Sequence, residues 1–167
     1  MPWRRSGVSR FSAEGQMRVE QSLTIDAPRA TVWDFVTDPG NYLKVMDGLT
    51  RWEVAGDRDR GLGARYRMLI RVGSADVGGL IEVVEWSPVG DMAWSSVMGV
   101  DQRGRWRLRE LSDGRTRVTF RFAYGVAGGG IAGLIAERVA APSLRRRFRQ
   151  SLLNVKRALE EHPGTAG

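Results

Sequence analysis

The feature that most constrains this chain is a strict alternation of arginine with apolar residues in its second half. Every odd position from 103 to 109 is arginine, whereas Trp106 and Leu108 take even positions. Successive side chains of a strand point to opposite faces, so a period of two indicates strands with one face buried and the other in water. The pattern returns after Ser112-Asp113-Gly114, which is typical of a hairpin. There the apolar row is Val118, Phe120, Phe122 and Tyr124, against Arg115, Arg117 and Arg121.

Five further segments are expected to be extended, which brings the predicted sheet to about seven strands. The glycine pairs and turn residues around them suggest where each strand stops. Gly73-Ser74 and Gly78-Gly79 are expected to interrupt the chain between the third and fourth of these segments, and residues 87–90 to form a turn. The five segments are residues 17–25, 49–55, 62–72, 80–86 and 92–98.

Two short helices are expected between the first two strands. Asp26 is predicted to be the N-cap of the first helix, with Pro28 near its first turn and residues 38–40 at its end. A weaker pattern predicts the second helix over residues 42–46. The apolar stripe of the first helix is Val32, Trp33, Phe35 and Val36.

A long amphipathic helix is expected at the C-terminal end, after a glycine-rich link at residues 125–133. Pro142 is expected to kink or restart this helix, because a proline inside a helix removes a hydrogen bond and crowds the preceding turn. Beyond Pro142, apolar residues recur at spacings of three and four, which predicts one buried face. They are Leu144, Phe148, Leu152, Val155 and Leu159.

These elements predict one α+β domain over residues 17–162. Its core is a curved, seven-stranded antiparallel sheet around the long C-terminal helix, with the two short helices between strands one and two. A chain of 167 residues can bury such a core without disulfides. Residues 1–16 are expected to be a mobile N-terminal tail, and residues 163–167 a C-terminal tail.

Five segments of the sequence resemble a known superfamily. They are LTIDAPRATVWDFVTDPGNY, GLGARYRM, IEVVEWSPVGDMAW, GRWRLRELSDGRTRVTF and SLRRRFRQSLLNVKRALE. Together they look like the START-like, Bet v 1-like (SRPBCC) superfamily, in its polyketide cyclase/dehydrase-type branch. The resemblance implies a helix-grip fold. It leaves function open, because the branch includes aromatase/cyclases and binders of lipids and hormones.

A sheet that curves around one helix is expected to leave a cavity between them, suited to a small hydrophobic molecule such as a polyketide, a lipid or an aromatic compound. Tyr66, Tyr124 and Ser96 could donate hydrogen bonds to that ligand. The alternative is that the same side chains simply fill the core. The candidate ligand-binding residues are Trp33, Phe35, Tyr66, Met68, Trp94, Ser96, Met98, Trp106, Phe120 and Tyr124.

Most ordinary catalytic machinery is excluded by composition. The chain has no cysteine, and its single histidine, His162, is close to the C-terminal end, so no cysteine nucleophile, Ser-His-Asp triad or histidine metal site is expected. Neither a cofactor nor a metal is predicted. Glu82 is a weak candidate for a general base, provided that it points inward with Leu80, Val84 and Trp86; the competing parity turns Ile81 and Val83 inward and Glu82 outward.

The formal net charge is +7, and only two of the 26 basic residues are lysine. The outer arginine rows and the basic helix over residues 145–157 suggest an alternative function, in which the basic surface contacts nucleic acid, anionic lipid or a protein partner. The resemblance implies that such a protein could be regulatory or toxin-like. Exposed aromatic residues are missing from those rows, so a solvated surface is the simpler interpretation. No apolar stretch reaches the length of a membrane span. A cytoplasmic protein is expected, and the sequence is compatible with a homodimer.

Overall fold

Seven strands form one antiparallel sheet, in the order β1-β7-β6-β5-β4-β3-β2. The computed structural model describes residues 16–125 and 131–161. The strands are β1 (Gln16–Ile25), β2 (Leu49–Val54), β3 (Arg65–Val72), β4 (Ala75–Ser87), β5 (Asp91–Gly99), β6 (Gln102–Glu110) and β7 (Thr116–Gly125). The helices are α1 (Arg29–Thr37), α2 (Pro39–Val45) and α3 (Ile131–Glu161).

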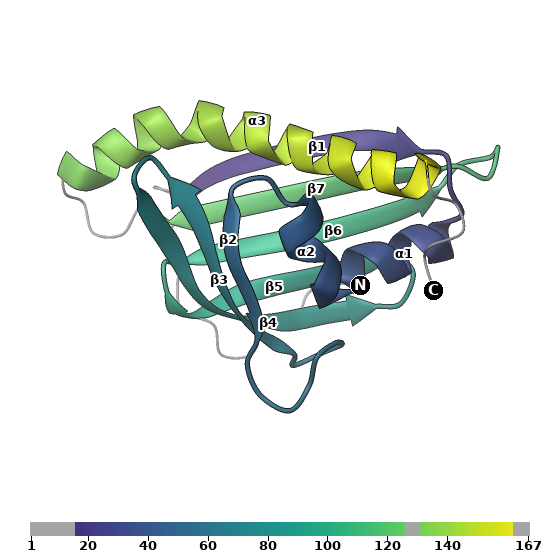
Figure 1. Ribbon diagram of the computed structural model, residues 1–167, viewed down its shortest axis with the longest axis horizontal. Coiled ribbons are helices and arrows are strands. Elements are labelled where there is room, and N and C mark those ends of the chain that lie inside the picture. Colours follow the sequence, from purple (N-terminus) through teal and green to yellow (C-terminus); the bar gives the residue numbers. More distant parts are fainter. Residues whose placement is uncertain (1–15, 126–130, 162–167) are drawn as a thin grey trace, which may run out of the picture.

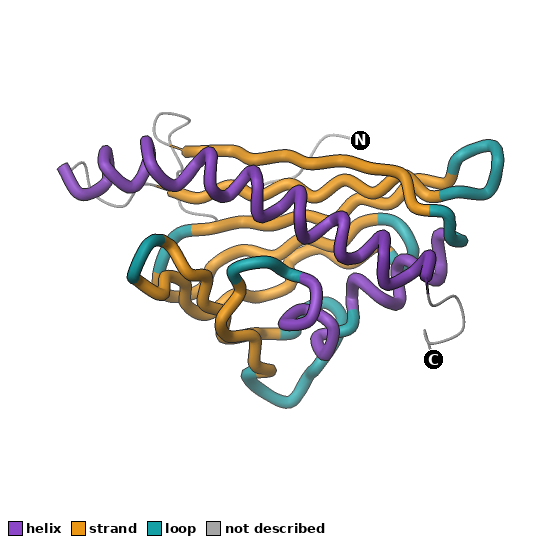
Figure 2. Tube along the Cα trace, turned by 45° about the horizontal axis from the view of Figure 1, so that its top comes forward, coloured by secondary structure: helices purple, strands orange, loops and turns teal. Residues whose placement is uncertain are grey.

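All three helices lie on one side of the sheet (Figure 1). The long helix α3 runs obliquely across the strands, and α1 and α2 lie between its C-terminal half and the strands at the other edge (Figure 2). Two contacts tie the end of α3 to β1 and the turn after it: Lys156 Nζ donates to the Thr24 carbonyl at 2.9 Å, and the Asp26 backbone N–H donates to Glu160 Oε1 at 2.8 Å. The predicted fold, a curved sheet around a C-terminal helix, is therefore confirmed.

The core lies between the concave face of the sheet and α3. Period-two alternation identified the buried rows of β6 and β7 correctly, since Trp106, Leu108, Val118 and Phe120 are all at most 2% exposed. The apolar stripe of α3 is buried as well, from Leu144 through Phe148, Leu152 and Val155 to Leu159.

Two β-bulges change which residues of β4 and β5 face the core, so the observed faces differ from the predicted ones. In the pairing of these strands, Val97 is an extra residue of β5 and Val84 an extra residue of β4. Each extra residue reverses the faces that follow it. Ile81 and Val83 are thus buried, Val84 is exposed, and Trp86 beyond the second bulge turns back to the core.

Several boundaries differ from the expectations. Pro28, not Asp26, is the N-cap of α1, and no side chain caps it. The segment at residues 38–40 ends α1 as expected, with Asp38 as its C-cap, and it also begins α2. There Asp38 Oδ1 accepts from the Gly40 N–H at 2.8 Å, and Pro39 occupies the first helical turn. Helix α3 is continuous through Pro142, so this residue does not restart it.

The glycine pair that was expected to interrupt the sheet lies inside β4. A Cβ on Gly78 would come within 2.0 Å of the Met68 carbonyl oxygen, and one on Gly79 within 2.1 Å of the Met98 carbonyl oxygen. These glycines therefore mark a close approach of backbones in the middle of a bent sheet. Most of the predicted N-terminal tail, the C-terminal tail with His162, and residues 126–130 of the glycine-rich link lie outside the described residues.

Candidate functional site

Four aromatic rings from α2, β2, β3 and β5 form a continuous stack on the concave side of the sheet. Tyr42 lies parallel to Trp52, with ring centroids 4.1 Å apart and planes 7° apart. On its other side, Trp52 stacks on Tyr66 at 4.8 Å. Trp94 meets Trp52 edge to face at 6.2 Å, with an interplanar angle of 77°. Such pairs add to the energy of burying the rings and hold each ring in one orientation.

A second group of rings connects this stack to α3. Phe120 of β7 lies 5.9 Å from Trp94 and 4.6 Å from Trp106, measured between ring centroids. Phe148 of α3 reaches the sheet between two rings, 5.1 Å from Phe120 and 5.2 Å from Phe122. Phe148 is thus the aromatic contact between the long helix and the rings of the sheet.

A small apolar cavity lies where the two groups of rings meet α3. The space in it that a water molecule can occupy is about 20 Å³, which is room for roughly one water. A second space, of about 10 Å³, lies nearby under α1 and α2. The interior is therefore nearly filled, and the hollow that was expected from the fold is much smaller than a usual ligand pocket. Residues lining the larger cavity are Tyr42, Met46, Asp47, Leu49, Trp52, Met68, Ile70, Trp94, Phe120, Phe122 and Phe148.

The loop between α2 and β2 borders the cavity and is fastened to α3 by hydrogen bonds. Ser151 Oγ accepts from the Asp47 backbone N–H at 2.8 Å and donates to the Arg147 carbonyl at 2.8 Å. Asn154 Nδ2 donates to the Val45 carbonyl at 3.0 Å. We call Ser151 and Asn154, with the two backbone groups of residues 45 and 47 that they bind, the latch. Any widening of the cavity at this loop has to break it.

Two hydrogen-bond donors beside the cavity have no acceptor among the described residues. The indole Nε1 atoms of Trp52 and Trp94 are buried and have no partner within the described part of the chain. Trp106, by contrast, donates from Nε1 to the Tyr42 hydroxyl at 3.2 Å. A buried donor without a partner costs about 1–3 kcal/mol, so two of them beside one cavity call for an explanation.

The two buried tyrosine hydroxyls of the stack are already engaged. Tyr42 donates to the Val36 carbonyl at 2.7 Å, and Tyr66 donates to the Asp59 carbonyl at 2.6 Å. Burial raises the pKa of Tyr42 well above its ordinary value. Burial, with the negative charge of Asp59, raises the pKa of Tyr66 to about 12. Both hydroxyls thus stay protonated at neutral pH, and their protons point at backbone oxygens.

Of the candidate residues named from sequence, five lie at the two spaces. Met68, Trp94 and Phe120 line the larger cavity. Phe35 and Trp106 line the smaller one. The structure therefore brings together residues from α1, β3, β5, β6 and β7 that lie far apart in the chain.

Three other candidates lie in or beside the core, away from both linings. Trp33 packs edge to face on Trp86 with ring centroids 5.0 Å apart. Tyr66 forms the outer end of the aromatic stack. Tyr124 is half-buried, with its ring 6.0 Å from that of Phe122. Their rings support the fold around the cavity.

Two candidates on β5 line neither space, although Ser96 lies on the inner face opposite Ile81. Met98 is 69% exposed, because the bulge at Val97 turns it outward, so its predicted inward position is wrong. Ser96 lies at the turn into β6, where its hydroxyl is 3.2 Å from Asp101 Oδ1 and accepts from the Gln102 N–H at 3.2 Å. It orders that turn.

Glu82 points to the outer face of the sheet. Its carboxylate pairs with Arg65 Nε at 2.6 Å, and its side chain is 29% exposed. Ile81 and Val83 take the inward positions, which is the competing parity. The burial on which a role as general base depended is therefore absent.

Residues that the sequence reading did not single out form much of the cavity. Trp52 lies in a segment that was expected only to be extended, and Tyr42 and Met46 lie in the weakly predicted second helix. The sequence did carry a signal for Trp52. This aromatic residue stands between the charged residues Arg51 and Glu53 in a segment that was expected to be extended, so it should face the core. Phe148 was recognised as part of a buried stripe, but not as a cavity residue.

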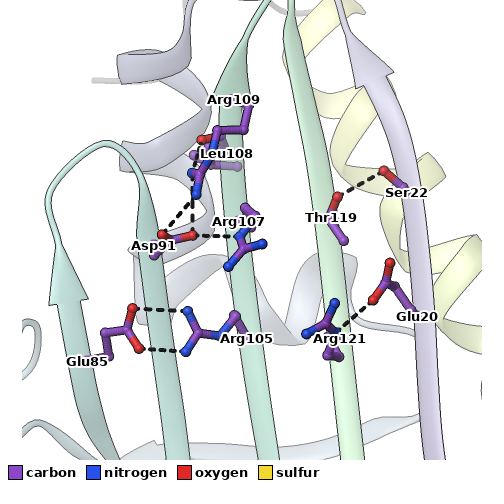
Figure 3. A network of polar contacts seen from close by, with 10 residues as sticks. All are labelled: Glu20, Ser22, Glu85, Asp91, Arg105, Arg107, Leu108, Arg109, Thr119 and Arg121. Atoms are coloured by element: carbon purple, nitrogen blue, oxygen red, sulfur yellow. Dashed lines mark hydrogen bonds and ion pairs between the residues drawn. The ribbon is translucent and has the colours of Figure 1, made fainter. Parts of the chain in front are cut away.

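The outer face of the sheet carries a network of ion pairs (Figure 3). Arg105 binds Glu85 through both guanidinium nitrogens, at 3.0 and 2.5 Å. Asp91 accepts from Arg107 at 3.2 Å and from Arg109 at 3.1 Å. Glu20 pairs with Arg121 at 2.7 Å in the same view, so three carboxylates of β1, β4 and β5 pair with four arginines of the rows on β6 and β7.

No membrane-spanning or metal-binding feature is found within residues 16–125 and 131–161. No helix there is long and apolar enough to cross a membrane. No three histidine, cysteine, aspartate or glutamate side chains come together there as a metal site.

Comparisons with known proteins agree with this architecture. The crystal structure of TTHA0849 from Thermus thermophilus is similar with a TM-score of 0.71 at 19% identity, over 84% of this chain and 94% of that chain. The Zhui aromatase/cyclase from Streptomyces sp. R1128 gives 0.70 at 20%, over 91% and 98%. One half of the di-domain ARO/CYC BexL of the BE-7585A biosynthetic pathway gives 0.63 at 19%, over 87% of this chain and 50% of that chain.

At such identities these likenesses show the fold alone, and no curated protein sequence matches the chain significantly. The family model described as "Polyketide cyclase / dehydrase and lipid transport" matches residues 16–160, which is nearly the whole domain. The chain therefore belongs to the polyketide cyclase/dehydrase and lipid transport family.

Proposed function

We propose that the protein binds a small hydrophobic molecule, of polyketide, lipid or aromatic type, between the concave face of the sheet and α3. The observation that carries the proposal is the lining of the cavity, in which aromatic and methionine side chains meet at a loop held to α3 by the latch. Membership of a family described by cyclase, dehydrase and lipid transport activities supports it.

Such a ligand needs more room than the cavity has in the structure. Met46 and Met68 line it, and methionine side chains adapt their shape at low energetic cost because they are unbranched and have three rotatable bonds. Breaking the latch releases two hydrogen bonds worth about 1 kcal/mol each. Burial of a bicyclic ligand repays that cost, at about 25 cal/mol per Å² of apolar surface.

The proposal covers ligand binding and does not extend to catalysis. Among the residues that line the cavity only Tyr42 and Asp47 carry titratable side chains; the hydroxyl of Tyr42 is engaged, and Asp47 is exposed. The aromatase/cyclase relatives raise the narrower hypothesis of cyclisation, which would rest on the shape of the interior that folds the substrate. A regulatory function through the basic surface has less support, because four of the outer arginines of β6 and β7 are paired with carboxylates of the same sheet.

Native mass spectrometry of protein purified from its own host tests the proposal. We expect a bound molecule of defined mass that organic extraction removes and identifies. The variant Met46→Trp, which fills the cavity, should lose this molecule, whereas Met98→Trp, on the exposed outer face, should keep it.

Circular dichroism is the control that checks whether both variants are folded. A molecule that remains in folded Met46→Trp would place the binding site elsewhere. Protein that carries no small molecule but copurifies with nucleic acid would replace the proposal with the basic-surface alternative.

A further inference from the structure

The two unpaired indole groups point to the kind of ligand. Trp52 and Trp94 come from different strands, both line the larger cavity, and both have a buried Nε1 without an acceptor in the described chain. They are 8% and 4% exposed, so bulk water does not satisfy them. We propose that the ligand presents a ketone or phenol oxygen, carried on a flat apolar body, to the N–H groups of Trp52 and Trp94. This inference rests on the proposed function and narrows it.

The surrounding side chains show why these two donors differ from their neighbours. Trp106 donates to Tyr42, Tyr42 donates to Val36, and Tyr66 donates to Asp59, so the other aromatic donors of this region have protein acceptors. Among the buried aromatic donors of residues 16–125 and 131–161, only the indoles of Trp52 and Trp94 have no acceptor, and both residues line the same cavity. Leaving just these donors unpaired is the arrangement expected of a site that is completed by a ligand.

The cavity walls offer almost nothing that could replace such an acceptor. Apart from the engaged hydroxyl of Tyr42 and the exposed carboxylate of Asp47, the lining side chains are aliphatic, aromatic or thioether groups. Trp94 lies against the backbone of Gly104, where its cross-strand partner has no side chain at all. The free space suits a single water, which a ligand oxygen would displace while making the same hydrogen bonds.

The two indole N–H donors without protein acceptors favour ligands that carry a hydrogen-bond acceptor. A site built around hydrogen-bond donors disfavours an analogue that lacks the oxygen, because its buried N–H groups then remain unpaired. The many aromatic side chains that line the cavity favour a flat partner. An aromatic ketone or phenol meets both conditions, whereas a plain hydrocarbon chain meets neither.

The matched probes 2-acetylnaphthalene and 2-ethylnaphthalene test this inference, since they differ only in the carbonyl oxygen. Assigned ¹⁵N–¹H spectra of the wild-type protein report each indole N–H separately. With the ketone, the Trp52 and Trp94 indole protons should move downfield, as expected for a new hydrogen bond, and that of Trp106 should not. When the protein is saturated with 2-ethylnaphthalene, the Trp52 and Trp94 indole protons should not show this downfield shift.

Affinities supply a second readout. In Trp52→Phe/Trp94→Phe the ratio of ketone to hydrocarbon affinity should fall about thirtyfold from its wild-type value, as expected for the loss of two hydrogen bonds. The control Trp86→Phe removes an indole outside the cavity and should leave the ratio unchanged. If the double variant does not fold, the wild-type spectra decide the question alone.

The outcomes separate the two proposals. Binding of both probes at the cavity, with no oxygen-dependent shift and an unchanged affinity ratio, would overturn the donor assignment and leave the proposed function intact. Failure of both probes to perturb any cavity residue would overturn the proposed function, and this inference with it. Oxygen-dependent shifts at Trp52 and Trp94 support both.

Discussion

At the scale of single residues, one glycine determines where an aromatic wall of the cavity lies. Gly104 of β6 pairs with Trp94 of β5, and a Cβ added to it would come within 2.0 Å of Trp94 Cζ2. The indole therefore lies flat on the neighbouring strand. No larger side chain at this position leaves Trp94 its present place.

We predict that Gly104→Ala destabilises the protein and disturbs the cavity. Overpacking of this kind costs about 1–3 kcal/mol, because the indole must shift against Trp52 and Phe120. Urea unfolding measures the loss. Gly90→Ala is the matched control: its Cβ would make only ordinary contacts, the nearest at 3.5 Å, so a change within about 0.5 kcal/mol is expected. Equal stability of the two variants would contradict this account of Gly104.

At the scale of secondary-structure elements, the latch holds the loop that borders the cavity against α3. Ser151 is 1% exposed, and its hydroxyl joins the α2–β2 loop to α3 while also bonding within the helix. Asn154, one turn further along α3, holds the end of α2. The stability of these contacts sets how often the loop separates from α3.

We predict that Ser151→Ala and Asn154→Ala each lower the free energy of unfolding by about 1 kcal/mol and speed the uptake of 2-acetylnaphthalene. The faster uptake follows because the loop opens more often. Stopped-flow quenching of tryptophan fluorescence measures the association rate. Ser22→Ala, which loses a bond from β1 to the Val118 carbonyl far from the loop, should leave that rate unchanged. An unchanged rate in both latch variants would show that the ligand enters elsewhere.

Sequence reasoning succeeded for elements with unbroken periodicity. The faces of β6 and β7 and the stripe of α3 follow from spacing alone, because no bulge or break shifts their register. It failed on β4 and β5, where the extra residues Val84 and Val97 reverse the faces, and no residue type in the sequence marks them as bulges. Met98 was misplaced for that reason, and the parity of Glu82 stayed open between the two faces.

The cavity was only partly predictable from the sequence. Residues on long regular strands, such as Met68 and Phe120, were named correctly as inward residues. Tyr42 and Met46 were not, because a helix of seven residues has too little periodicity to define a buried face. Unpaired indole groups are a tertiary feature, since they depend on which acceptors other elements bring near.

At the scale of the whole molecule, the two faces of the sheet perform different tasks. The concave face carries the aromatic core, whereas the outer face carries the paired arginines (Figure 3). Asp91 is central to that outer network. Burial acts to raise the pKa of its carboxyl, but the hydrogen bonds and charges of Arg109 and Arg107 outweigh burial and lower the pKa below its ordinary value.

A lowered pKa in the folded state makes the contribution of Asp91 to stability depend on pH. The contribution is present above the ordinary aspartate pKa and is lost as the pH falls through the lower folded value. Asp91→Asn should therefore be less stable than the wild type at neutral pH, with a difference that shrinks in the acid range below that ordinary value.

Urea unfolding at a series of pH values measures this difference. Glu53→Gln, which removes a long, exposed 3.6 Å pair with Arg51, should show little difference from the wild type at any pH. A stability difference for Asp91→Asn that stays constant into strong acid would contradict the role assigned to its charge.

The most direct test of a ligand between the sheet and α3 is to locate a bound probe by nuclear Overhauser effects to ¹³C-labelled methionine methyl groups. Met46 and Met68 line the cavity, and Met98 is exposed on the outer face. Our account predicts contacts from 2-acetylnaphthalene to the Met46 and Met68 methyls and none to Met98. Contacts to Met98 alone would contradict it.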